Sequence, residues 1–112
     1  MTAIQKRRSM ALTLAHAMRK RNPTLSFSEV QLQGWKVLRL TEKMREKQTK
    51  FTFRKVNGAL REAIGTVDYD LERTIVKRGS RKVPTIRYFD LTKNSDGQPK
   101  GWRSFRAELA QL

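Results

Sequence analysis

The residue types that usually perform chemistry are scarce in this chain. His16 is the single histidine, and it stands in a basic helical segment with neither a carboxylate nor a thiol nearby. The sequence has no cysteine, which excludes disulfides, thiolate nucleophiles and cysteine-based zinc sites. No serine has a base beside it, and no glycine loop of the phosphate-binding type is present. We therefore predict a protein that is not an enzyme and that needs no cofactor.

The acidic cluster Val67-Asp68-Tyr69-Asp70-Leu71-Glu72 is the remaining candidate for chemistry. Alternate carboxylates can bind a divalent cation or act as a general acid and base. The sequence places no further ligand beside them, so a loop whose carboxylates pair with nearby arginines is the better interpretation. Asn94-Ser95-Asp96-Gly97 lacks the later ligands and the closing glutamate of a calcium loop. We predict no metal site.

Positive charge is the strongest global signal. The 112 residues include 25 Lys and Arg against 10 Asp and Glu, a net charge of +15. Charge of this size attracts polyanions in a salt-dependent manner, and nucleic acid (DNA or RNA) is the partner that it favours. The alternatives are a protein–protein module that docks its basic surface on an acidic partner in a larger assembly, and a basic protein that is merely soluble. No apolar run is long enough to span a membrane and the first residues do not form a signal peptide, so we expect a cytoplasmic protein.

The first basic segment is a predicted helix over residues 3 to 21. Apolar residues from Ile4 to Met18 recur at helical spacing, and Asn22-Pro23 ends the helix. Residues 1–25 form either a cationic arm for phosphates or a docking helix with a solvated face, and both interpretations stay open. The apolar stripe is rich in alanine and lacks aromatics, so no membrane contact is predicted. The candidate phosphate-binding residues are Lys6, Arg7, Arg8, Arg19, Lys20 and Arg21.

The second basic segment runs from Arg73 to Phe89 and has no acidic residue. A third strand is predicted over Arg73–Lys77, followed by a turn at Gly79-Ser80. A flexible cationic tip of this kind could probe a groove or a phosphate backbone, and the alternative is a solvated turn. The candidate nucleic-acid-binding residues of this tip are Lys77, Arg78, Arg81 and Lys82.

The rest of the chain, residues 26–112, reads as one small domain. Ser26 and Glu29 form a capping box, and the second helix is predicted to run to about Glu46 with apolar residues over much of its circumference. We expect it to pack partly on the first helix and partly on strands, and Gly34 could let another backbone come close. Alternation then predicts a hairpin, in which a strand with Phe51 and Phe53 on one side returns through a two-residue Asn-Gly turn. In the return strand, Gly65 predicts a bulge or bend.

Two aromatic segments, Ile86–Leu91 and Gly101–Arg106, read as neighbouring antiparallel strands joined by an irregular connector. Gly101–Arg106 has an apolar side chain on each side, which predicts that both of its faces are covered. Its Trp102, like Tyr88, could stack on a base, although burial in the core is the better expectation for both. Asp90 and Arg103 are expected to form an ion pair across the two strands.

These segments together support a comparison with a known family. The shared motifs are the Phe27-Ser28-Glu29 helix containing Trp35, the Phe51–Lys55 strand with its Asn57-Gly58 turn, Arg61–Thr66, Tyr88-Phe89-Asp90 and Trp102–Arg106. They resemble a family of small, largely uncharacterised proteins found in Bacteroidetes, their phages and mobile elements. That resemblance implies an Sm-like or Src-homology-3-like barrel related to WYL domains, over residues 27 to 106. The Trp-Tyr-Leu tripeptide that names WYL domains is absent, so no ligand-sensing residue is carried over.

The predicted fold class is therefore α+β: two N-terminal helices followed by a small antiparallel Sm-like or Src-homology-3-like β-barrel of about five strands. The predicted function is non-enzymatic nucleic-acid binding, mainly through backbone contacts. A regulatory or mobile-element setting is what the resemblance implies.

Overall fold

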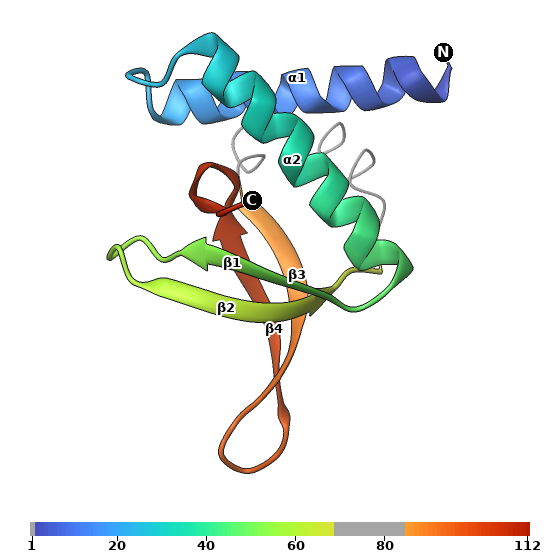
Figure 1. Cartoon of the computed structure of the whole chain (residues 1–112), viewed down its shortest axis with the longest axis vertical. Helices are drawn as coiled ribbons and strands as arrows, with labels where there is room; N and C mark the ends of the chain where they lie inside the picture. The colour runs from blue at the N-terminus through green and yellow to red at the C-terminus, as the bar shows by residue number, and fades with distance from the viewer. Residues whose placement is uncertain (1, 69–84) are drawn as a thin grey trace.

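Two helices lie over a small, strongly curved antiparallel sheet in the computed structural model, which describes residues 2–68 and 85–112 (Figure 1). Helix α1 spans Ala3–Arg21 and α2 spans Phe27–Glu46. Each begins with a capping box, Thr2 with Gln5 in α1 and Ser26 with Glu29 in α2. The predicted bounds of both helices are confirmed.

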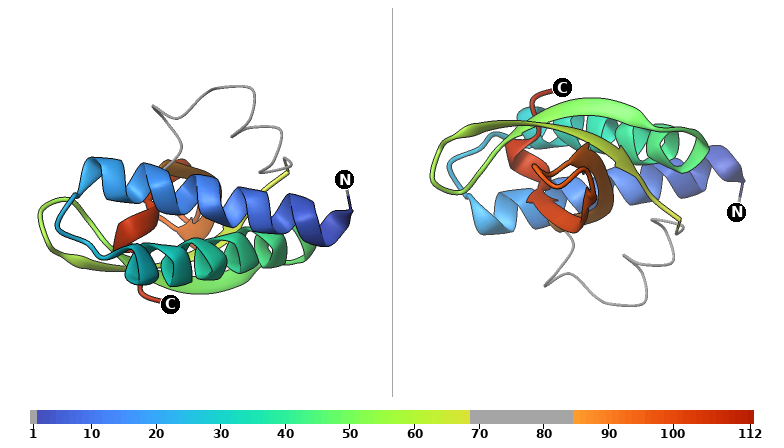
Figure 2. Two further views of the ribbon diagram at one scale, coloured as in Figure 1. Left: turned by 90° about the horizontal axis from the view of Figure 1, so that it is seen from above. Right: turned by 90° about the horizontal axis from the view of Figure 1, so that it is seen from below.

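The two helices cross where both are made of small residues. A β-carbon built on Gly34 would lie 2.6 Å from the backbone oxygen of Ala11 and 3.5 Å from the backbone nitrogen of Ala15. Only glycine permits this approach, so Gly34 sets the distance between the helices, as the sequence indicated. Seen from above, α1 and α2 run side by side across the sheet (Figure 2). Ile4, expected on the buried stripe, is instead 67% exposed because it precedes the crossing.

Four strands form the sheet in the part of the chain that is described: β1 (Thr49–Arg54), β2 (Leu60–Thr66), β3 (Thr85–Lys93) and β4 (Pro99–Arg106). They pair in the order β1-β2-β3-β4, each antiparallel to the next. The β3–β4 hairpin extends away from the helices (Figure 1). The additional strand predicted over Arg73–Lys77 lies outside the described residues.

The sheet curls until its first strand meets the chain that follows its last. After β4, a 3-10 helix, η1 (Ala107–Leu109), turns the chain back toward β1. Ala110 then forms a β-bridge with Phe53, and the Gln111 backbone nitrogen donates a hydrogen bond to the Thr52 carbonyl at 2.9 Å. These contacts close the barrel.

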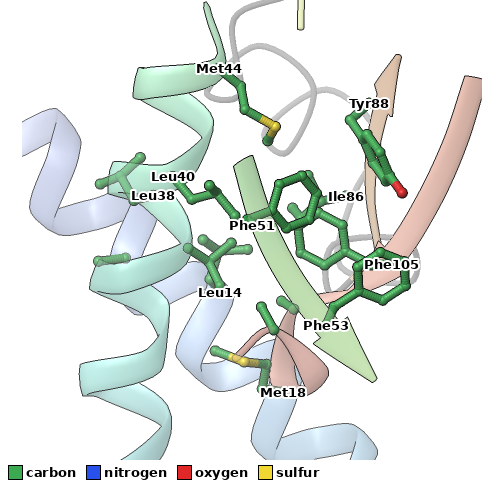
Figure 3. Close-up of a cluster of buried hydrophobic side chains, with 14 of the residues drawn as sticks. Leu14, Met18, Leu38, Leu40, Met44, Phe51, Phe53, Ile86, Tyr88 and Phe105 are labelled. Atoms are coloured by element: carbon green, nitrogen blue, oxygen red, sulfur yellow. The ribbon is translucent and has the colours of Figure 1, made fainter. Parts of the chain in front are cut away.

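Aromatic rings fill the space between the sheet and the helices (Figure 3). Phe51 is 5.2 Å from Tyr88 and 5.2 Å from Phe105, centroid to centroid, and Phe53 is 5.5 Å from Phe105. Leu14 and Met18 of α1 and Leu38, Leu40 and Met44 of α2 cover this cluster. Tyr88 and Phe105 thus close the barrel against Phe51 and Phe53.

Two glycine predictions are refined by the structure. Of the bulge or bend predicted at Gly65, the bulge is wrong, since the β1–β2 register is unbroken up to the Thr49–Gly65 pair. A β-carbon there would lie 2.7 Å from the Met44 sulfur and 2.9 Å from a Phe51 ring carbon, so Gly65 is needed for close packing. The Asn57-Gly58 turn is also not the two-residue type, because Gly58 (φ 89°) has a positive φ and Asn57 does not.

Both hairpin connections use the same three-residue construction. The Gly58 nitrogen donates to the Lys55 carbonyl, and the Lys55 nitrogen donates to the Ala59 carbonyl. In the β3–β4 connection, the Gly97 nitrogen donates to the Asn94 carbonyl, and the Asn94 nitrogen donates to the Gln98 carbonyl. A turn followed by a glycine at positive φ is the usual three-residue hairpin loop. The tip of the connector predicted as irregular is therefore a regular turn, and the irregularity lies beside it, where the register shifts between Asp90 and Lys93.

Candidate nucleic-acid interface

Helix α1 presents cations on two flanks. It has six basic residues and no acidic one, and its buried face holds it against α2 and the barrel. Lys6, Arg8, Arg19 and Lys20 are exposed, with no ion pair among the described residues. Arg8 and Arg19 lie about three turns apart on one flank, and Lys6 and Lys20 lie about four turns apart on the other. These four predicted residues offer positive charge from a helix whose position is fixed.

Arg7 lies on the side of α1 that faces α2. Its Nε and Nη2 atoms each donate to a carboxylate oxygen of Glu42 at 2.9 Å, a bidentate pair. Its guanidinium carbon also lies 5.7 Å from the Trp35 ring centroid. The hydrogen bond and the charge of Glu42 raise the pKa of Arg7, which stays a cation. Arg7 therefore joins the two helices, and Trp35 is partly buried beneath it.

Arg21, the last predicted cation of α1, ties the helix to the end of the barrel. Its Nη1 donates to Glu108 Oε1 at 3.0 Å, and its Nη2 donates to Thr85 Oγ1 at 3.4 Å. The Glu108 carboxylate is largely buried, so Arg21 neutralises a charge that water would otherwise have to solvate. Of the predicted α1 set, Arg7 and Arg21 have partners within the protein. The predicted tip residues Lys77, Arg78, Arg81 and Lys82 lie outside the described residues.

A basic stripe on α2 was missed by the sequence analysis. Lys36, Arg39 and Lys43 occur at positions i, i+3 and i+7, which places them on successive turns of one helix face. Arg39 and Lys43 are exposed, and the Lys36 amine donates to the Leu112 carbonyl at 3.4 Å. The i, i+3, i+7 spacing is readable in the sequence. Glu42 and Glu46 lie close to these cations in the sequence, so the charge of the segment as a whole does not reveal the stripe.

The outer face of the β3–β4 hairpin bears an aromatic pair. Phe89 and Trp102 are directly opposite in the strand register, with ring centroids 5.5 Å apart and planes at 85°. The guanidinium carbon of Arg87 lies 4.6 Å from the Trp102 ring centroid. Trp102 is 44% exposed. The prediction that both faces of this strand are covered is thus wrong, and so is burial of Trp102, because only the face of β4 that bears Phe105 meets the core.

On the inner side of the barrel, Asp90 is fully buried and takes part in an ion pair. Its Oδ2 accepts from Arg61 Nη2 at 3.4 Å, and its Oδ1 accepts from the Thr92 backbone nitrogen at 2.9 Å. The predicted partner, Arg103, stands opposite Tyr88 in the register, whereas Gly101 stands opposite Asp90. The predicted Asp90–Arg103 pair is therefore wrong, since Arg61 reaches the carboxylate from β2.

Tyr88 is also fully buried and cannot stack on a ligand. Burial, followed by the negative charge of Asp90, raises the pKa of Tyr88 to about 12, while the charges of Arg61 and Arg103 act in the opposite direction. The hydroxyl has no hydrogen-bond partner within the described part of the chain. Of the two residues predicted to be able to stack on a base, only Trp102 is exposed enough to do so.

Metal sites and membrane spans are both absent from residues 2–68 and 85–112. In that part of the chain, no three histidine, aspartate or glutamate side chains stand together as metal ligands would. Neither α1 nor α2 has the apolar length that a membrane crossing requires. Of the predicted acidic cluster, only Val67 and Asp68 lie in the described range.

Comparison with known families identifies the fold. A family model, described as WYL_2 with an Sm-like SH3 beta-barrel fold, matches residues 37–109, which is more than half of the chain. The chain belongs to the WYL_2 family. The matched stretch begins within α2 and ends in η1, so it includes all four described strands, and the six cations of α1 precede it. Neither curated proteins nor solved structures gave a match.

WYL_2 membership agrees with the architecture. Four strands, a 3-10 helix and a short closing bridge to β1 make up a small barrel of the Sm-like type, preceded by the two predicted helices. The predicted fold class is confirmed. The match gives no organism, ligand or partner.

Proposed function

We propose that this WYL_2 protein binds nucleic acid, DNA or RNA, mainly through the phosphate backbone and without catalysing a reaction. The observation that supports this most is the distribution of charge on α1. Four exposed cations stand on a helix without carboxylates, while Arg7 and Arg21 are paired with Glu42 and Glu108. The two paired arginines contact the rest of the protein, and the four other cations are available to phosphates.

The α2 stripe enlarges the surface to which phosphates could bind. Lys36, Arg39 and Lys43 lie on a second helix that packs directly on α1 through Gly34. A polyanion that follows both helices would release several counterions, and its affinity would fall steeply with salt. The resemblance to proteins of phages and mobile elements supports, within the same proposal, a regulatory role in such a setting.

The test measures binding of labelled duplex DNA and single-stranded RNA at several salt concentrations. We expect log Kd to rise linearly with log salt. The double variant Arg8→Gln/Arg19→Gln should lower the slope by about 1–2, because each lost phosphate contact removes about 0.9 on duplex DNA. If neither nucleic acid binds at about 50 mM salt, where such contacts are strong, the proposal is wrong.

A matched control removes the same charge elsewhere. Lys55 and Lys93 are exposed lysines beside the two hairpin turns, so Lys55→Gln/Lys93→Gln also lowers the net charge by two. Its slope should stay at the wild-type value. Equal slopes for the two double variants would indicate attraction by net charge alone, without an interface on α1. Docking on an acidic protein, the competing interpretation, predicts no binding to either nucleic acid.

A further inference from the structure

The Trp102 side chain is held on the surface in a fixed orientation. It stands opposite Phe89 on the outer face of the β3–β4 hairpin, and the edge-to-face contact between the rings has a centroid distance of 5.5 Å. Arg87, two residues before Phe89 on the same face, places its guanidinium carbon 4.6 Å from the ring centroid. These contacts restrict the indole, yet 44% of Trp102 remains exposed.

The outer aromatic pair is not required by the core. The inner face of the same hairpin already provides Tyr88 and Phe105, which pack against Phe51 and Phe53. Leaving a tryptophan exposed keeps apolar surface in contact with water, which is unfavourable and which a polar residue at this position would avoid. Its surroundings therefore point to a ligand that covers a flat aromatic ring.

The charge around Trp102 indicates what kind of ligand this is. Strand β4 includes Lys100 and Arg106 and has no carboxylate, whereas Arg103 alternates to the other side, opposite Tyr88. The nearest strand carboxylate on β3, Asp90, points inward and is paired with Arg61. A ligand on this face would meet an aromatic platform bordered by cations, the combination that binds unpaired bases together with their phosphates.

We infer that Trp102, supported by Phe89, is a base-stacking site for single-stranded nucleic acid. This inference rests on the proposed function and names its substrate class. In a duplex each base is stacked on its neighbours, so only an unpaired base can offer its face to the indole. The cations of α1 and α2 would then supply general affinity for phosphate, and Trp102 would supply the preference for single strands.

The experiment compares Trp102→Ala with wild type on a single-stranded oligonucleotide of about 12 nucleotides, within the range of site sizes of small barrels, and on the matching duplex. We expect single-strand affinity to fall about 5- to 150-fold, and duplex affinity to be unchanged. The salt slope should stay the same in both proteins, because stacking releases no counterion. Trp102→Phe should retain most of the single-strand affinity, since it keeps an aromatic face.

Two controls separate stacking from general damage. Leu32→Ala removes another large, exposed apolar side chain (56% exposed) from α2 and should leave single-strand binding unchanged. In a Trp35→Phe background, Trp102 is the sole tryptophan, and its fluorescence should be quenched by the single strand and not by the duplex.

The results distinguish this inference from the proposed function. If wild type binds single strands while Trp102→Ala binds them equally well, the stacking site is wrong and the phosphate interface stands. The same holds if wild type shows no preference for single strands over duplex. If wild type binds no nucleic acid at all, both proposals fail.

Discussion

The two faces of the β3–β4 hairpin use similar residues for opposite purposes. On the inner face, Tyr88 and Phe105 are buried with Phe51 and Phe53 and form the core of the barrel. On the outer face, Phe89 and Trp102 make an equally close aromatic pair that remains accessible to solvent. A shift of one residue along the strand separates a structural aromatic from an available one. Aromatic content alone therefore says little about binding, and the strand register decides it.

The cations of α1 show the same division on a helix. Arg7 and Arg21 are paired with Glu42 and Glu108, and Arg8 and Arg19 are exposed on another flank. In each case one face contacts the rest of the fold and the other is exposed to solvent. The comparison of inner and outer faces can be tested by changing them separately.

The largest effect is expected from Phe105→Ala on the inner face. Its ring contacts Phe51, Phe53 and Tyr88, so its removal leaves a cavity that its neighbours cannot fill. We expect a loss of about 3–5 kcal/mol in the free energy of unfolding, measured by denaturant titration. A loss below about 1 kcal/mol would contradict the assignment of this ring to the core.

A smaller effect on the same face depends on pH. The pKa of Tyr88 is raised to about 12 in the folded state, against about 10 in an unfolded chain. The stability that this shift contributes is complete below about pH 10 and is lost as the pH rises through about 12, a change on the order of 2–3 kcal/mol.

Tyr88→Phe is the matched control for this titration, because lysines also lose charge in that range. The variant should resemble wild type near pH 7, since the Tyr88 hydroxyl has no hydrogen-bond partner within the described residues. Between about pH 10 and 12 it should lose less stability than wild type. If the free energy of unfolding fell equally with pH in the two proteins, the buried Tyr88 hydroxyl would not titrate as stated.

Gly65→Ala tests how tightly the inner face is packed. The added methyl group would meet the Met44 sulfur, the Phe51 ring and the Tyr88 ring at 2.7, 2.9 and 3.0 Å. We expect a loss of about 1–3 kcal/mol by thermal or denaturant unfolding, because three neighbours must shift at once. Gly58→Ala is a useful contrast, since nothing lies within 4 Å of its added carbon and any cost comes from its positive φ.

The smallest effect on stability is expected from Trp102→Ala on the outer face. It removes contacts with Phe89 and Arg87, worth about 0.5–1 kcal/mol at an exposed site, and opens no cavity. By denaturant titration, the free energy of unfolding of Trp102→Ala should be close to that of wild type and well above that of Phe105→Ala. A loss comparable to that of Phe105→Ala would remove the distinction between the faces.

Much of the fold could be predicted from local sequence signals. The capping box at Ser26 and Glu29, the proline after Asn22 and the alternation around Phe51 and Phe53 are short-range features, and the structure agrees with each. Gly34 was also identified correctly, because a glycine inside an amphipathic helix is typical of a close crossing.

The errors concern long-range choices that local patterns do not determine. Which side of β4 faces the core depends on its register with β3, so Trp102 was assigned to the wrong environment. The partner of Asp90 depends on a third strand, from which Arg61 reaches across. On α1, Arg21 could not be distinguished from the exposed cations by sequence, because its partner Glu108 lies far away in the chain, in η1.

The closure of the barrel at Phe53 and Ala110 has a consequence for synthesis of the protein. The two residues are far apart in sequence, and the bridge joins the first strand to the stretch after the last. During translation, α1, α2 and the β1–β2 hairpin can form early, but the edge of β1 has no partner until Gln111 has left the ribosome. Before that moment the edge is open to pairing with other chains, as unpaired strand edges are. The nascent chain therefore passes through a period in which this edge can pair with other chains, and the period ends when residues 110 and 111 have emerged.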